Sequence, residues 1–166
     1  MTERRARVKI RKMNQADLPT VKATDLLLFG DSRLPTWPFS FEEYWTAYRP
    51  DISFVAELDG RVAGFIVGTV VVEEHSYSVL NLRKASARPP RYRQVGWIDM
   101  IGVHPEHQHS GIGRSLVEAF CSECGRINAV VKGVAAADDD RLKRFLETAG
   151  FKLGNLVVYE RDPSSP

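Results

Sequence analysis

The chain has 166 residues, of which 43% are hydrophobic and 27% charged, and its formal net charge is +2. This length allows one domain with a substantial core, and we expect that domain over residues 1–162, followed by a disordered tail at 163–166. The near-neutral charge gives no reason to expect binding to nucleic acid or to a membrane. The basic segment 1–12 lacks the apolar stretch of a signal peptide, so we expect a cytoplasmic protein.

The spacing of apolar residues predicts alternating strands and helices. Ser40 followed by Glu43 is typical of a capping box at a helix start, and Asp59-Gly60 between two apolar runs is typical of a β-hairpin. Gly125 and Gly150 are each placed to end a helix. In chain order we expect a strand at 7–13, a helix from Asn14, a helix at 41–48, strands at 52–58, 61–72 and 95–103, a helix at 111–124, a strand at 129–136, a helix at 138–149 and a strand at 153–160.

Two groups of residues raise the question of metal or redox chemistry. Cys121 and Cys124 are the only cysteines; a C-x-x-C pair is typical of redox or zinc sites, but no second pair completes a zinc site. We interpret the two as small apolar residues in a helix seam. His104, His107 and His109 have loop spacing rather than the H-x-x-x-H spacing of a helical metal site. We interpret them as solvated loop residues and expect no metal.

The most informative segment is Gln108-His109-Ser110-Gly111-Ile112-Gly113, which lies between a predicted strand and a predicted helix. The first N–H groups of a helix have no partner within the helix, and glycine lets the backbone approach an anion closely. The segment is therefore predicted to bind a phosphate with its main chain. A dinucleotide-binding loop would need a third glycine where Leu116 stands, and a P-loop would need a lysine after Gly113.

The Q-x-x-G-x-G pattern that remains follows the strand end Ile101-Gly102-Val103-His104-Pro105, and together they resemble the pyrophosphate loop of the GNAT N-acetyltransferase superfamily. The order of the predicted elements and the Gly150-Phe151 step after the last helix are also similar to that family. The resemblance implies an α/β fold with a central, twisted mixed sheet. About four helices would flank this sheet, and it would be splayed between its fourth and fifth strands, where pantetheine would lie.

The same resemblance implies acetyl-CoA, or another acyl-CoA, as cosubstrate. Main-chain groups of Ile101 and Val103 would pair with pantetheine, and a backbone N–H near Ile101 would polarise the thioester carbonyl. The glycine loop, helped by Arg114 and Ser115, would hold the pyrophosphate. The residues expected to contact the cofactor are Ile101, Gly102, Val103, Gln108, His109, Ser110, Gly111, Ile112, Gly113, Arg114, Ser115 and Asp139.

On this resemblance we expect an N-acetyltransferase in which a primary amine of a small molecule or protein attacks acetyl-CoA directly. The resemblance also allows a homodimer. Two alternatives stay open. One is a non-catalytic acyl-CoA-binding or regulatory domain, and the other is a binding module whose glycine loop holds a different nucleotide.

The chain departs from the family pattern in its last predicted helix. The position where the family often has tyrosine, thought to protonate the departing thiolate, is Leu146, and the usual asparagine position is Asp139. Water is then an option for that proton, because a thiol with a pKa of about 8.5 is a tolerable leaving group without help. The segment 132–137 does not match the Glu-Val-Arg-x-x-Asn stretch of ribosomal-protein N-terminal acetyltransferases, which argues against that subgroup.

Asp99 is the one acidic residue in the strand before the loop. Because side chains alternate along a strand, Trp97, Asp99 and Ile101 are expected to share one face. The family resemblance makes Asp99 the expected general base, and a structural hydrogen-bond acceptor is the alternative. Proton transfer from an alkylammonium of pKa about 10.4 to an aspartate of pKa about 3.9 costs roughly 9 kcal/mol. Asp99 can act as base only if burial narrows that gap.

Two further groups of residues bear on the acceptor. Seven aromatic residues within twenty positions are expected either to line the acceptor cleft or simply to cover the sheet. A basic run around Pro89-Pro90 is expected either to be a solvated loop or to recognise an acidic acceptor or a protein surface. The aromatic residues are Phe29, Trp37, Phe39, Phe41, Tyr44, Trp45 and Tyr48, and the basic ones are Arg83, Lys84, Arg88, Arg91 and Arg93.

Overall fold

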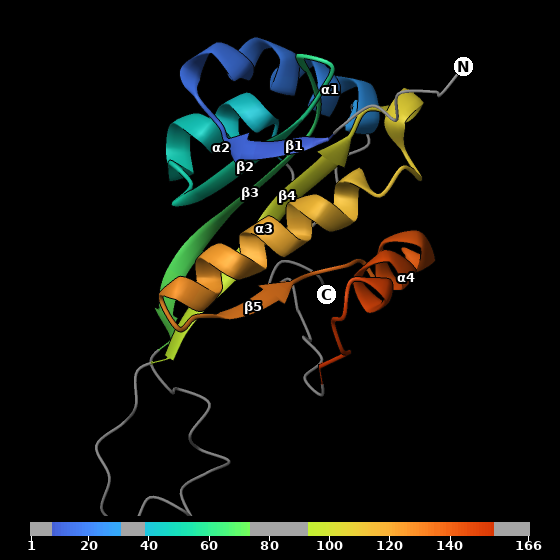
Figure 1. Ribbon diagram of the computed structural model, residues 1–166. Coiled ribbons are helices and arrows are strands. Elements are labelled where there is room, and N and C mark those ends of the chain that lie inside the picture. Colours follow the sequence, from blue (N-terminus) through green and yellow to red (C-terminus); the bar gives the residue numbers. More distant parts are fainter. Residues whose placement is uncertain (1–7, 31–38, 74–92, 155–166) are drawn as a thin grey trace, which may run out of the picture. The chain divides into compact units, whose positions relative to one another are not determined.

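The computed structural model describes residues 8–30, 39–73 and 93–154 (Figure 1). The chain divides into two compact units, Met1–Ala136 and Ala137–Pro166. The first unit contains β1 (Lys9–Lys12), a 3-10 helix (Gln15–Asp17), α1 (Leu18–Phe29), α2 (Phe41–Tyr48), β2 (Ile52–Leu58), β3 (Arg61–Glu73), β4 (Arg93–Val103), a second 3-10 helix (Pro105–His107), α3 (Ile112–Arg126) and β5 (Val130–Gly133). The second unit contains α4 (Asp140–Thr148).

The described strands form one mixed sheet in the order β1-β2-β3-β4-β5. The first three pairings are antiparallel, and β4 pairs with β5 in parallel. That last pairing covers only Val95–Ile98 of β4, matched to Val130–Gly133 of β5. The rest of β4, from Asp99 to Val103, continues past the end of β5. The expected splay between the fourth and fifth strands is therefore confirmed.

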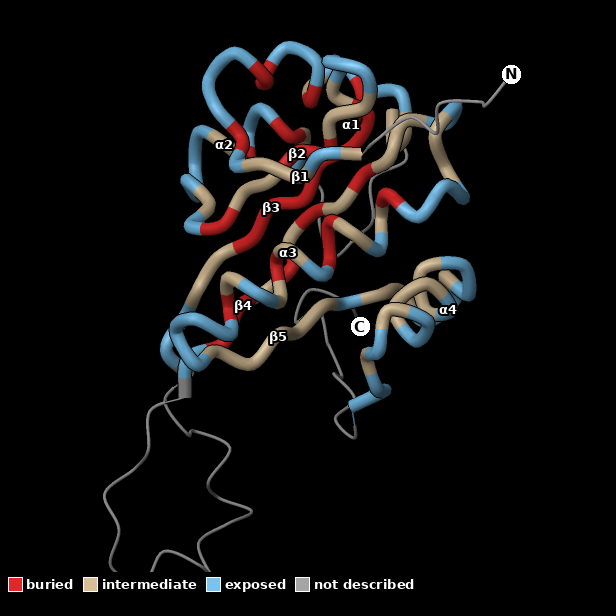
Figure 2. Tube along the Cα trace, viewed as in Figure 1, coloured by how far each residue is buried: buried red, intermediate tan, exposed pale blue. Residues whose placement is uncertain are grey.

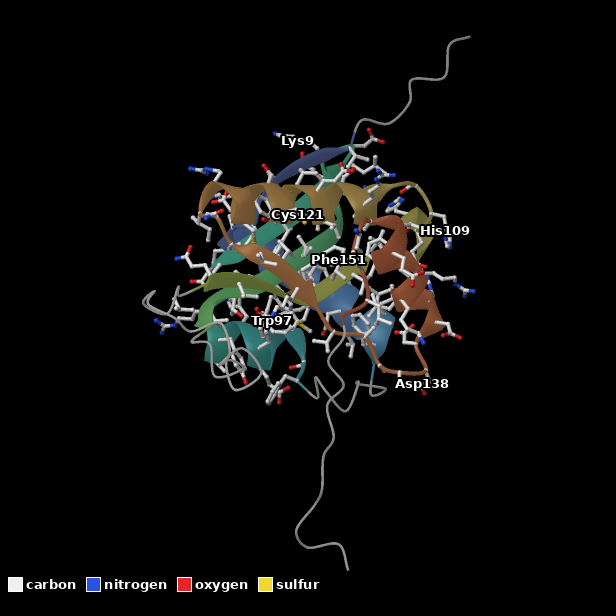
Figure 3. The ribbon with its side chains drawn as sticks, turned by 90° about the horizontal axis from the view of Figure 1, so that it is seen from below. Lys9, Trp97, His109, Cys121, Asp138 and Phe151 are labelled. Carbon is white, nitrogen blue, oxygen red and sulfur yellow. The ribbon has the colours of Figure 1, made fainter. Side chains whose placement is uncertain are left out.

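Helices cover both faces of this sheet. Helix α3 lies on one face, and α1 and α2 lie on the other (Figures 1 and 3). Residues on the α1 and α2 side form a buried cluster that includes Phe41, Tyr44, Phe65, Val67 and Met100. On the other side, α3 buries the apolar stripe that its sequence predicts, and Figure 2 shows the buried stretches of α3 turned to the sheet. The stripe consists of Ile112, Leu116, Val117, Phe120 and Cys124.

A β-bulge interrupts the pairing of β3 with β4. Val67 is opposite Met100 and Gly68 is opposite Ile98, so Asp99 is the extra residue. Gly68 fits this site because it has no side chain: a Cβ there would lie 2.0 Å from the Trp97 carbonyl oxygen and 2.6 Å from the Phe120 ring. Bulges bend a strand and redirect its side chains. This one controls what β4 presents on each face.

Most predicted elements are confirmed, with shifts at their ends. The hairpin strands β2 and β3 flank Asp59-Gly60 as expected, and Ser40 and Glu43 form the predicted capping box of α2. Strand β5 and helix α4 are shorter than predicted. Residues 153 and 154 are not in a strand, and residues 155–160 of the expected last strand lie outside the described residues, as do residues 163–166.

The prediction that Gly125 ends α3 is wrong. The helix runs on to Arg126, and Asn128 takes the left-handed conformation (φ 56°) that we expected of a glycine. Its N–H donates to the Gly125 carbonyl, and the Ala129 N–H donates to the Cys124 carbonyl, which together form a Schellman motif. Asparagine tolerates this conformation better than most residues. Gly150 (φ 92°) ends α4 in the same way, as predicted.

The first strand is fastened by charged side chains. Arg11 makes two hydrogen bonds to the carboxylate of Asp17, at 2.7 and 2.8 Å, and one to Glu57 at 2.8 Å. The Arg11 hydrogen bonds hold the pKa of Asp17 below its ordinary value. The group ties β1 to β2 and to the first 3-10 helix.

Among the described parts of the chain, no helix is long and apolar enough to cross a membrane.

Two glycine substitutions test the bulge. Gly68→Ala should lower the free energy of unfolding by about 1–3 kcal/mol, because the new methyl group would meet a backbone oxygen that cannot move away cheaply. Gly125→Ala is the matched control in α3, where a Cβ meets nothing within 4 Å. It should raise stability by roughly 0.5–1 kcal/mol. Urea unfolding of both variants measures this, and equal stabilities would contradict the close packing at Gly68.

Candidate active site

The bulge residue Asp99 is held by a tyrosine from α2. The hydroxyl of Tyr44 donates to Oδ2 of Asp99 at 2.7 Å. Tyr44 is fully buried, with its ring against Phe41 and stacked on Tyr48 at a centroid distance of 5.5 Å. Thr69, opposite Trp97 on β3, also hydrogen-bonds Asp99. Helix α2 thus delivers a phenol to a carboxylate 55 residues away along the chain.

Burial and these hydrogen bonds act on Asp99 in opposite directions. Burial raises the pKa of Asp99 and is the largest influence, while the hydrogen bonds from Tyr44 and Thr69 lower it and the nearby charge of Asp51 raises it. The net effect is a raised pKa. Burial and the Asp99 carboxylate also raise the pKa of Tyr44, which keeps its proton and remains a donor. The site is a half-buried carboxylate with a higher proton affinity than a solvated aspartate.

The prediction that Trp97, Asp99 and Ile101 share one face is wrong for Ile101. A Cβ on Gly96 would meet Cys124 of α3, so its neighbour Trp97 points to the α2 side, where Figure 3 also places it. Asp99 meets Tyr44 on that same side. Ile101 pairs with Ile66 of β3. Ile66 lies two residues from Gly64 and so shares its face, and Gly64 faces Ile112 and Leu116 of α3, so Ile101 points to the α3 side. The extra residue of the bulge reverses the side on which the following side chains of β4 point, and a strict alternation of side chains along a strand does not predict this.

Beyond Asp99, one edge of β4 extends past the end of β5. Ile101 and Val103 lie in this segment and turn toward α3, and Gly102 turns toward α1. A Cβ on Gly102 would come within 2.6 Å of Phe65 and 2.8 Å of Leu28, so packing against α1 requires glycine there. The other edge of the segment pairs with β3. The main chain at 99–103 is therefore available, within the described part of the molecule, for pairing with an extended ligand.

The glycine loop begins where β4 ends. The Gln108 side chain donates to the Val103 carbonyl at 3.2 Å and ties the loop to the strand. His109 (φ 62°) and Gly111 (φ 87°) are both left-handed, and the Ser110 hydroxyl donates to the His107 carbonyl. These contacts fold the loop so that Gly111 stands at the start of α3.

The start of α3 has no side-chain cap among the described residues. Ser40 and Asp139 cap α2 and α4 with side-chain oxygens, and α1 continues directly from a 3-10 helix, whereas α3 begins after Gly111, which has no side chain to cap it. The first N–H groups of α3 are thus left for solvent or a ligand. Gly111 accepts only the ordinary helical bond from the Ser115 N–H, at 3.0 Å.

The remaining predicted cofactor residues are placed as follows. Arg114 is exposed and pairs with Glu118 one turn along α3, at 3.0 Å. Asp139 belongs to the second unit, where its Oδ1 accepts the Leu142 N–H at 2.9 Å and caps α4. Leu146, at the family's tyrosine position, is a half-buried residue of the same helix.

The aromatic group proves to be mixed. Phe41 and Tyr44 belong to the core, as the sheet-covering alternative predicts, but Tyr44 also reaches the candidate site. Tyr48 and Phe39 are partly exposed, with ring centroids 5.9 Å apart. Trp37 lies outside the described residues, as do Arg83, Lys84, Arg88 and Arg91 of the basic run. No local pattern in the sequence signals that Tyr44 bonds Asp99, because the two residues are 55 positions apart.

The two cysteines fit the packing interpretation. Burial raises the pKa of the Cys121 thiol and raises that of Cys124 to about 11. A thiol that holds its proton is a poor nucleophile and a poor metal ligand at neutral pH. The sulfur of Cys124 packs against Gly96, and a Cβ at position 96 would lie only 2.4 Å from that sulfur. This contact explains the small residue at position 96.

Solved structures share this fold at low sequence identity. The aminoglycoside N-acetyltransferase AAC(6')-Iy in complex with CoA is 16% identical, with a TM-score of 0.67 over 98% of this chain and 99% of that one. The aminoglycoside 6'-N-acetyltransferase AAC(6')-Ih from Acinetobacter baumannii is 18% identical, with a TM-score of 0.66 over 94% and 98%. A ribosomal-protein-alanine N-acetyltransferase from Brucella melitensis biovar Abortus 2308 is 17% identical, with a TM-score of 0.65 over 94% and 99%. At these identities the likeness establishes the fold alone.

Sequence comparison assigns the family. None of the curated proteins compared matches the chain. The family model for the acetyltransferase (GNAT) family matches residues 22–151, which include most of α1, helices α2 to α4, the bulged strand and the glycine loop. The chain belongs to the GNAT acetyltransferase family.

Proposed function

We propose that this protein transfers an acetyl group from acetyl-CoA to a primary amine of a small molecule or protein. The observation that carries the proposal is a juxtaposition on one strand. Asp99, with a raised pKa, stands at the point where β4 passes beyond β5, and the same strand leads into the uncapped start of α3. Family membership and the shared fold of an aminoglycoside N-acetyltransferase solved in complex with CoA support this choice.

Acetyl-CoA would bind along β4. Its pantetheine arm is a chain of amides that can pair with the main chain of Ile101 and Val103, as a further strand would. Its pyrophosphate would then meet the N–H groups from Gln108 to Ser115 at the positive end of the α3 dipole. Gly111 matters most in this loop because its left-handed backbone has no Cβ to stand in the way.

The amine nitrogen would attack the thioester carbonyl carbon. A C–N bond forms, the C–S bond breaks, and the products are an amide and CoA. Asp99 would accept the proton that the attacking ammonium must lose, directly or through a water molecule. Burial of the carboxylate reduces the roughly 9 kcal/mol gap between ordinary ammonium and aspartate pKa values, and this direction is the one that the base role requires.

Two other groups of the reaction need stabilisation. The negative charge on the carbonyl oxygen would be met by a main-chain N–H near Ile101, since the bulge interrupts the ladder of β4 just before it. The departing thiolate would take its proton from water, because Leu146 stands at the family's tyrosine position.

A panel of amines tests the proposal. The purified chain is incubated with acetyl-CoA and with polyamines, aminoglycosides or peptides, and thiol release and acetylated products are measured. Amine-dependent thiol release supports an enzyme. Heat stabilisation by CoA without turnover on any amine would favour the non-catalytic domain, and stabilisation by NAD or ATP instead of CoA would favour a different nucleotide module.

The loop assignment predicts a binding defect. Gly111→Val should weaken acetyl-CoA binding at least tenfold, about 1.4 kcal/mol. Gly60→Val is the matched control, because Gly60 also has a positive φ (81°) and also has open space around its Cβ position. Because both substitutions introduce similar backbone strain, a loss of acetyl-CoA affinity in Gly111→Val that is absent in Gly60→Val reports on the loop. Equal affinities in calorimetry would remove the pyrophosphate assignment.

The base assignment predicts a loss of rate. Asp99→Asn keeps the shape of the side chain and removes its ability to accept a proton, so kcat should fall by roughly 10²–10⁴. Acetyl-CoA binding should change little. Steady-state kinetics over a range of pH, together with calorimetry, checks both expectations. A wild-type kcat at every pH would leave Asp99 with a structural role only.

The Tyr44 hydrogen bond predicts a shift in the pH dependence. The bond lowers the pKa of Asp99, so Tyr44→Phe should raise it. A base acts only when deprotonated, and the acid limb of the kcat/KM profile should therefore move to higher pH. Tyr48→Phe removes the hydroxyl of the ring that stacks on Tyr44 and should leave the limb in place. Superimposable profiles for wild type and Tyr44→Phe would show that this bond does not tune the base.

A further inference from the structure

A short turn between β4 and the glycine loop brings two histidines together. His107 N–H donates to the His104 carbonyl at 2.8 Å, which closes one 3-10 turn. Side chains three residues apart on such a turn lie on the same side. The two imidazole rings accordingly lie with their centroids 5.7 Å apart.

A carboxylate adds a third donor to the same turn. Oε2 of Glu106 is 4.0 Å from Nδ1 of His104. One ligand atom from each of His104, Glu106 and His107 can be chosen so that all three lie within 4.8 Å of one another. In the described stretches of the chain, no other set of three or more such side chains comes this close.

We propose that His104, Glu106 and His107 form a binding site for a divalent transition-metal ion, with Zn²⁺ as the best match. Two imidazoles and one carboxylate form the His₂Glu donor set that zinc accepts, with a fourth position left for water. Zinc bonds of about 2.0–2.2 Å place neighbouring ligand atoms roughly 3.4 Å apart. The Glu106 side chain is 80% exposed and that of His104 32%, so side-chain rotation can close the remaining distance.

This site revises our interpretation of these histidines as solvated loop residues. That interpretation compared them with the H-x-x-x-H spacing of an α-helix, whereas a 3-10 turn pairs residues three apart. The turn also leads directly into the glycine loop: the Gln108 N–H donates to the Pro105 carbonyl, and the Ser110 hydroxyl donates to the His107 carbonyl. A bound ion would fasten the turn from which that loop starts.

Zinc titration of the full chain tests the site without acetyl-CoA, so its outcome is independent of the proposed acetyl transfer. Protein stripped of metal is titrated with Zn²⁺ in competition with a chromophoric chelator, and Co²⁺ provides an absorption spectrum that reports the ligand geometry. Wild type should bind one equivalent. His104→Asn, which can still accept the Glu106 N–H at the turn, and His107→Asn should each weaken binding at least tenfold.

His109→Asn is the matched control. It makes the same change in the same loop, and asparagine tolerates the left-handed backbone at this position (φ 62°). Zn²⁺ affinity should stay at the wild-type value in this variant, and Glu106→Gln should lose at least tenfold. Circular dichroism confirms that each variant folds. Absence of saturable binding, equal affinity in His104→Asn, or an equal loss in His109→Asn would overturn the site, and an unchanged Glu106→Gln would overturn the carboxylate as ligand.

Discussion

The β-bulge at Asp99 is the constraint on which the rest of the molecule depends. One extra residue in β4 reverses the alternation of its side chains, so that Trp97 and Asp99 face α2 while Ile101 and Val103 face α3. A regular strand would have sent Asp99 and Ile101 to the same side. The bulge thus separates the Asp99 carboxylate from the apolar residues that pack against α3, although they belong to one short segment.

Two glycines near the bulge leave room for close packing. Gly68 cannot carry a Cβ because the Trp97 carbonyl and the Phe120 ring occupy that space, and Gly96 is limited in the same way by Cys124. Close packing of α3 over these two glycines leaves Cys124 and Phe120 buried. The helix that begins at the candidate phosphate loop is therefore held against the strand that carries Asp99. The two halves of the candidate site are positioned by a single packed interface.

Asp99 also shows how a fold keeps a charge partly out of water. Removal from solvent disfavours the carboxylate, and the Tyr44 and Thr69 hydrogen bonds offset only part of that cost, so the pKa remains raised. A carboxylate that is more basic than usual stabilises the fold less than a solvated one would at neutral pH, but it is better suited to take a proton from an amine. Tyr44 contributes to both the fold and the site, because its ring packs in the core and its hydroxyl donates to Asp99.

The sequence alone determined the features that local chemistry decides. The Asp59-Gly60 hairpin, the Ser40 capping box, the glycine loop, the order of elements and the family resemblance are all readable because each depends on residues a few positions apart. Only the tertiary structure decided where β5 stops pairing with β4, that Asp99 is a bulge residue and that Tyr44 binds it. These features depend on pairing register and on packing between distant segments, and the periodicity of a single strand or helix carries no record of its partner.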